Sequence, residues 1–115
     1  MTSAHNHVKP IIKAFQRFAQ YDVKMQLSTA MALLYVADQQ DKDGGVSTGD
    51  IQKWLGITSA AASRNSYYWG EGHSDMPHSG YGLVSVNIHP TDRRLRTLKL
   101  TARGEAFIKQ LEDIL

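Results

Sequence analysis

The feature that most constrains the fold of this chain is a pair of short amphipathic segments joined by a tight turn. The first starts after the cap-forming pair 47–48 and ends at Leu55, and the second spans residues 59–69. Gly56 and Thr58 lie in the turn, where glycine ends a helix and threonine is a favoured N-cap for the next one. Two short helices joined in this way are typical of a helix-turn-helix, and we expect this segment to form one.

The second of these segments has two distinct faces. Ala62, Ser66 and Trp69 recur at helical spacing, so we expect them to pack on the first segment. The other face carries small side chains, which let a helix lie deep in a DNA groove, and one guanidinium that can fork onto guanine or hold a phosphate. The residues expected to contact DNA from this helix are Thr58, Ser59, Ala60, Ser63, Arg64 and Tyr67.

Two alternating segments further along the chain predict a β-hairpin. Val84, Val86 and Ile88 share one face of residues 83–88, and leucines share one face of residues 94–100, with 89–93 as the tip. Residues 93–103, in this hairpin (called the wing below) and just after it, carry basic side chains with no acid among them, although the net charge of the chain is only +2. A basic wing after a helix-turn-helix predicts a winged helix that contacts DNA. The basic residues are Arg93, Arg94, Arg96, Lys99 and Arg103.

Three further helices are predicted from apolar positions that recur at helical spacing. One starts near residue 6 or 8, the next after the serine or threonine at 28–29, and the last after Thr101, a capable N-cap. Their apolar positions are Val8, Ile11, Ile12, Phe15 and Ala19 in the first, Leu27, Met31, Leu34 and Tyr35 in the second, and Phe107, Leu111, Ile114 and Leu115 in the last.

The length and composition of the chain fit one domain. Its 115 residues, 42% of them apolar, can bury a single core. The absence of cysteine excludes disulfides and thiol-ligated metal sites. No apolar run is long enough to cross a membrane and no signal peptide is recognisable, so we expect a cytoplasmic protein. We expect a mainly α fold with a small β-hairpin (α+β), in a single winged-helix domain over residues 1–115.

Within this domain the two ends of the chain are expected to form a homodimer. The N-terminal helix lies in residues 1–25, the winged-helix core in 26–100 and the C-terminal helix in 101–115. The terminal helices carry more apolar side chains than so small a domain needs, which favours an interface between two copies. The residues concerned are Phe15, Phe18, Phe107, Ile108, Leu111 and Leu115.

Several of these segments resemble the MarR family of bacterial winged-helix regulators. The run GITSAAASR, residues 56–64, is similar to the turn and recognition helix of that family. Gly82, Leu83 and Val84 resemble the start of its first wing strand. The resemblance extends over roughly residues 26–105 and is carried most specifically by a spaced wing pattern, D-x-R-x5-L-T-x2-G, formed by Asp92, Arg94, Leu100, Thr101 and Gly104.

The resemblance implies roles for particular residues. Arg64 would contact DNA from the recognition helix, Asp92 would brace Arg94, and Arg93, Arg94 and Arg96 would meet the minor groove or phosphates. It also implies a dimer and a transcriptional regulator, repressor-like, that binds double-stranded DNA. The chain differs from the family in the long stretch 70–81 before the wing. Because this stretch is rich in glycine and poor in aliphatic residues, we expect an extended or mobile connection that gives the wing more freedom.

A second reading makes the winged helix a protein-interaction module that docks on a polymerase or replication partner, with weak or no DNA contact. The modest net charge and the 70–81 stretch favour it. Independently of that reading, the basic wing has a plainer interpretation as a solvated hairpin edge. An aromatic platform for single strands at residues 67–69 is less favoured, because consecutive helical positions point in different directions.

Enzymatic and metal-binding functions find little support in the sequence. It has no glycine-rich phosphate loop, no H-E-x-x-H and no G-x-S-x-G, so we expect no enzyme and no cofactor. His73, Asp75 and His78 have a spacing that a metal tolerates, but in a glycine-rich loop we expect them to be solvated rather than to bind one. No catalytic or metal-ligating residue is therefore predicted.

Overall fold

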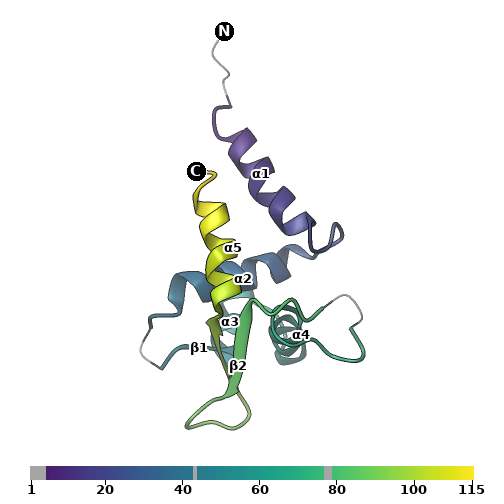
Figure 1. Cartoon of the computed structure of the whole chain (residues 1–115). Coiled ribbons are helices and arrows are strands. Elements are labelled where there is room, and N and C mark those ends of the chain that lie inside the picture. The colour runs from purple at the N-terminus through teal and green to yellow at the C-terminus, as the bar shows by residue number, and fades with distance from the viewer. Residues whose placement is uncertain (1–4, 43, 77–78) are drawn as a thin grey trace.

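The helix-turn-helix is present as α3 (Thr48–Leu55) and α4 (Ser59–Trp69) in the computed structural model, which describes residues 5–42, 44–76 and 79–115 (Figure 1). Ser47 is the N-cap of α3: its side chain accepts a hydrogen bond from the Asp50 N–H, and the Asp50 carboxylate accepts one from the Ser47 N–H, both 3.0 Å long. Gly56 ends α3 in the left-handed conformation, with φ 63°, and Thr58 caps α4. The capping residues in the local sequence therefore determine where these two helices start and end.

The wing is an antiparallel hairpin of β2 (Val84–Ile88) and β3 (Arg96–Leu100), as the alternation predicts. A short strand that the sequence analysis did not identify, β1 (Val46–Ser47), pairs with β3 on its other side, giving the order β1-β3-β2. Leu98 and Leu100 are buried, whereas Ile88 at the far end of β2 is 53% exposed because the strand runs out beyond the core. The sheet thus fixes the start of the wing and leaves its tip in solvent.

The other helices are α1 (Val8–Ala19), α2 (Leu27–Gln39) and α5 (Ala102–Glu112), the last capped by Thr101 as expected. In Figure 1, α1 and α5 project from one end of the molecule and the wing tip lies at the opposite end. Two predictions for α2 were wrong. It begins after Gln26 rather than after residue 28 or 29, and Leu27 and Leu34 on its expected apolar face are 61% and 43% exposed.

Helix α2 is instead buried through its small residues and two aliphatic ones. It contacts α3, α4, α5 and β3, so it lies at the centre of the domain. Alanine and threonine side chains are small enough for neighbouring elements to pack closely against α2, so the face of α2 that carries them is the buried one. The buried residues of α2 are Thr29, Ala30, Ala32, Leu33 and Val36.

An aromatic cluster joins α1, α4 and α5 in the core. The Phe18 ring packs edge-on against those of Phe107 and Trp69, with centroids 5.2 and 6.2 Å apart. The Trp69 indole N–H donates a 2.7 Å hydrogen bond to the Thr29 carbonyl, so its polar atom is satisfied in the interior. Phe18, Phe107 and Leu111 are buried in this core, and their assignment to a dimer interface was wrong.

The stretch 70–82 leaves α4 and returns to it. The Gly72 and Gly80 N–H groups bond to the Tyr67 and Tyr68 carbonyls, and a Cβ on Gly72 would lie only 3.0 Å from the Gly80 Cα. Both glycines have positive φ, near 80°, which other residues rarely adopt. Residues 82 and 83 then bond to the last turn of α4.

The expectation of an extended connection that frees the wing was therefore wrong, because the wing starts where α4 ends. Among the described residues between the paired glycines, His73 and Met76 form an isolated β-bridge. Within the described residues, no helix is both long and apolar enough to span a membrane.

Candidate nucleic-acid interface

A groove of about 430 Å³ lies between α4 and the wing and is called the α4–wing groove here. Small residues of α4 form one wall, and the wing arginines form the other. Of the residues predicted to contact DNA, the groove brings together Ser59, Ala60, Ser63 and Tyr67 with Arg93, Arg94 and Arg96. The structure thus places residues 59–67 and 93–96 side by side although more than twenty positions separate them in the sequence.

Three lining residues of the groove were missed by the sequence analysis. Thr48 and Gln52 come from α3 and Leu95 from the wing. Thr48 and Gln52 lie one helical turn apart on the same side of α3, which is the only signal that the sequence offers for them. Thr48 also links the elements, because its hydroxyl accepts a 3.1 Å hydrogen bond from the Arg96 N–H.

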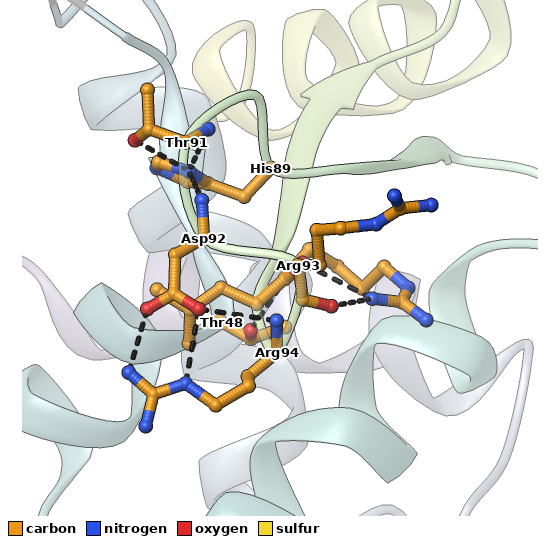
Figure 2. Close-up of polar contacts among 8 residues, drawn as sticks. Thr48, His89, Thr91, Asp92, Arg93 and Arg94 are labelled. Carbon is orange, nitrogen blue, oxygen red and sulfur yellow. Dashed lines mark hydrogen bonds and ion pairs between the residues drawn. The ribbon is translucent and has the colours of Figure 1, made fainter.

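At the wing tip, Asp92 holds Arg94 in place through both carboxylate oxygens (Figure 2). The Nε and Nη2 atoms of Arg94 lie 3.0 and 2.9 Å from these oxygens, and the Arg94 N–H donates to the same carboxylate. These hydrogen bonds and the charge of Arg94 lower the pKa of Asp92, and the contact raises the pKa of Arg94. The Arg94 side chain is nevertheless 89% exposed, so the guanidinium is oriented while still open to a ligand.

The backbone of the tip is held by side chains of the wing itself. The His89 ring nitrogen Nδ1 accepts hydrogen bonds from the N–H groups of Thr91 and Asp92, 3.2 and 3.1 Å long (Figure 2). On the other side, one guanidinium nitrogen of Arg96 donates to the carbonyls of Arg93 and Leu95, both at 3.1 Å. A tip braced at these points presents its arginines in a fixed arrangement.

Two predicted residues do not line the groove. The Thr58 hydroxyl accepts a 3.1 Å hydrogen bond from the Ala61 N–H as the N-cap of α4. Arg64 is exposed on the flank of α4 turned away from the wing, beside Lys24 and Met76. Asn65, one position further on, is buried and accepts a 2.7 Å hydrogen bond from the Thr29 hydroxyl, which the sequence pattern did not reveal.

The residues considered for a metal site are only partly described. His73 Nδ1 lies 3.6 Å from an Asp75 carboxylate oxygen, and both side chains are exposed. His78 falls outside the described residues. In the part of the chain that the structure covers, no three histidine or acidic side chains gather closely enough to hold a metal ion.

Comparison with known proteins finds structural relatives. No family model and no curated protein match the sequence. A mutant of MepR from a multidrug-resistant S. aureus clinical isolate superposes with a TM-score of 0.67 and 22% identity, over 96% of this chain and 70% of that one. The S. aureus MepR–DNA complex gives 0.61 and 21%, over 92% and 75%. The heme sensor PefR of Streptococcus agalactiae, in complex with heme, gives 0.61 and 18%, over 99% and 74%.

The described residues form five helices and a three-stranded antiparallel sheet with a basic hairpin, which define a winged helix-turn-helix protein. The fold is that of the MarR-family regulators, as the resemblance of the recognition helix and wing implied.

Proposed function

We propose that this chain is a sequence-specific, double-stranded DNA-binding transcription regulator, repressor-like, that acts as a homodimer. The observation that carries the proposal is the α4–wing groove, where a helix face of small residues lies opposite arginines 93, 94 and 96. A structural relative, MepR, has been solved in a complex with DNA. In this proposal α4 enters the major groove and the wing contacts the backbone or the adjacent minor groove.

The chemistry of the groove suits this role. Ala60 and Ser63 leave space for base edges to approach the helix, and the Ser63 and Tyr67 hydroxyls can donate or accept hydrogen bonds there. The arginines are always charged and match the geometry of phosphate oxygens. Because only Arg94 among them is paired with a carboxylate in the described residues, the wing keeps an excess of positive charge.

The proposed dimer uses the outer face of α1 together with the end of the chain. Val8, Ile11, Ile12 and Phe15 are 46–52% exposed on one side of this helix, and Leu115 is 91% exposed. A row of exposed apolar residues on a projecting helix favours burial against a second copy. Two copies related by a two-fold axis would place their α4 helices in successive major grooves about 34 Å apart. In the proposal, segments 1–25 and 101–115 dimerise and 26–100 binds DNA.

The direct test is selection of duplexes from a random pool, followed by fluorescence anisotropy with a selected and a scrambled duplex across salt concentrations. We expect a pseudo-palindromic selected sequence, preferred over the scrambled one by about 10³-fold or more. Binding that ignores sequence at every salt concentration would remove the regulator claim. Failure to bind either duplex would instead favour the protein-interaction module.

The dimer is tested separately with Phe15→Glu, which places a charge in the exposed apolar row of α1. We expect a monomer by sedimentation velocity, and a selective loss of affinity for the full palindrome over a single half-site. Lys13→Glu is the matched control, since Lys13 is exposed on the polar side of the same helix. A Phe15→Glu protein that remains dimeric would show that another surface forms the interface.

A further inference from the structure

Helix α4 has a second hollow on its other flank, of about 170 Å³, separate from the α4–wing groove. Its walls come from α4, from the turn between α1 and α2, and from the loop after α4. This flank hollow contains Lys24 and Gln26 from the turn, Arg64 from α4 and Met76 from the loop. The recognition helix therefore lies between two concave surfaces, and each of them carries basic side chains.

The two cations of the flank hollow are free to bind a ligand. Arg64 and Lys24 are exposed, and neither side chain has a hydrogen bond or ion pair within the described part of the chain. The carboxylate in the same hollow, Asp22, is half-buried and accepts hydrogen bonds from the Lys24 N–H at 2.9 Å and from the Tyr68 hydroxyl at 3.4 Å. The acid is thus occupied within the protein while both cations face solvent.

Buried and half-buried contacts fix the turn against α4. The Thr29 hydroxyl bonds to the Asn65 side chain at 2.7 Å, and the Tyr68 hydroxyl reaches Asp22. The Tyr81 hydroxyl, from the segment after α4, donates a 3.0 Å hydrogen bond to the Tyr21 carbonyl in the turn. Because α4 is tied to the turn through Tyr68 and to the start of α2 through Asn65, the backbone positions of residues 24 and 64 are set relative to each other, as a two-point contact with a rigid ligand requires.

We propose that Lys24 and Arg64 form a second backbone clamp, which binds phosphates of the DNA strand on the flank of α4 away from the wing. The proposal rests on the proposed function, since it assigns the ligand as the same duplex. The major groove is bordered by a phosphate backbone on each side. When α4 lies in the major groove and the wing contacts the phosphate backbone on one side, the other flank of α4 faces the phosphate backbone on the opposite side. Arg64 is then a positioning contact to phosphate rather than a reader of bases.

The test compares Lys24→Gln, Arg64→Gln and the double variant with wild type in the anisotropy assay, over a range of salt concentrations. Log affinity falls as log salt concentration rises, and each lost phosphate contact reduces the magnitude of this slope by about 0.9. We expect the magnitude of the slope to fall by about 1 in each single variant and by about 2 in the double variant. The fall should be equal on the selected and the scrambled duplex. Lys13→Gln is the control, an exposed lysine on α1, and should leave the slope unchanged.

The outcomes separate this inference from the proposed function. If wild type binds no duplex, the proposed function fails and the clamp fails with it. If wild type binds but Lys24→Gln keeps the wild-type slope, only the clamp is overturned. An Arg64→Gln variant that weakens the selected duplex alone would also overturn it, because that pattern indicates base reading. Unchanged melting temperatures would show that the variants are folded, as expected for exposed side chains without partners in the described residues.

Discussion

The Asp92 carboxylate grips the Arg94 guanidinium through two parallel hydrogen bonds, 3.0 and 2.9 Å long, at the exposed tip of the wing. Such a fork fixes the direction of the guanidinium as well as its position. It also places an acid at a surface that we propose to face DNA. The negative charge of Asp92 by itself would oppose the binding of DNA. We therefore attribute the presence of the acid to its role in orienting Arg94.

Asp92→Asn should therefore reduce selectivity more than affinity. The variant frees Arg94 from its carboxylate and adds one net positive charge, so binding to a scrambled duplex should rise or stay level. Because an exposed ion pair is a weak contact, we expect the ratio of selected to scrambled affinity to fall by only about two- to five-fold. Arg94→Gln is the comparison, and it should lower affinity for both duplexes. An unchanged ratio in Asp92→Asn would show that the brace has no part in recognition.

Arg96→Ala should weaken selected and scrambled duplexes alike. Arg96 ties the wing backbone through the carbonyls of Arg93 and Leu95, and its remaining donors and charge are available to phosphate. Arg96→Lys keeps the charge but loses the planar fork, so it separates the two contributions. Recovery of affinity in Arg96→Lys would assign the effect to charge, and failure to recover would assign it to the shape of the wing. A loss confined to the selected duplex would contradict the prediction.

Ala60→Leu should block DNA binding without destabilising the fold. Ala60 is exposed on α4 and lines the α4–wing groove, where a larger side chain would occupy the space needed by base edges. Leucine and alanine have similar helix propensities, so the melting temperature should change little. We expect at least about a tenfold loss of affinity, which corresponds to about 1.4 kcal/mol. Wild-type affinity in Ala60→Leu would show that this face of α4 does not approach DNA.

Asp50→Asn should destabilise the protein at neutral pH and lose this effect in acid. Burial raises the pKa of Asp50, but hydrogen bonds from the Ser47 N–H and Lys42 outweigh it and hold the pKa below the usual value of 3.8. A lowered pKa means that the carboxylate stabilises the fold above about pH 3.8, and that this contribution is lost as pH falls through the folded-state pKa.

We expect Asp50→Asn to lower the free energy of unfolding by about 1 kcal/mol at pH 7, which corresponds to a fall of a few degrees in melting temperature. The difference in melting temperature from wild type should become smaller as the pH falls below 3.8. Asp113→Asn is the control, since its 3.5 Å pair with Lys109 is exposed. A difference from wild type that persists undiminished in acid would assign the effect of Asp50→Asn to packing instead.

Replacing residues 73–79 with Asn-Gly should leave the melting temperature nearly unchanged. The hydrogen bonds of Gly72 and Gly80 to α4 remain, and His73, Ser74 and Asp75 are exposed. Shortening the loop changes its closure entropy by about 1 kcal/mol at most. Tyr81→Phe is the contrasting variant, because it removes the hydrogen bond to Tyr21 and should cost about 1 kcal/mol. A large fall in melting temperature on shortening would show that the loop supports the core.

The places where helices start and end could be predicted where a local signal exists. Gly56 ends α3, and Thr58 and Thr101 are the N-caps of α4 and α5, as predicted. The alternation of apolar residues in β2 and β3 likewise predicts the wing. The start of α2 was misplaced because its N-cap is Gln26, which makes no side-chain cap hydrogen bond and so leaves no signature. The two-residue strand β1 was missed because it exists only through its pairing with β3.

The sequence by itself determined the helix-turn-helix and the wing, because caps, turns and alternation depend on residues within a few positions of one another. Tertiary structure decided which faces are covered. It buried Phe18 and Phe107 while leaving Phe15 exposed, and it turned Arg64 toward Lys24 rather than toward the wing. It also closed the 70–82 stretch onto α4. These outcomes depend on which elements pack together, and periodicity within one segment carries no information about the shape of its neighbours.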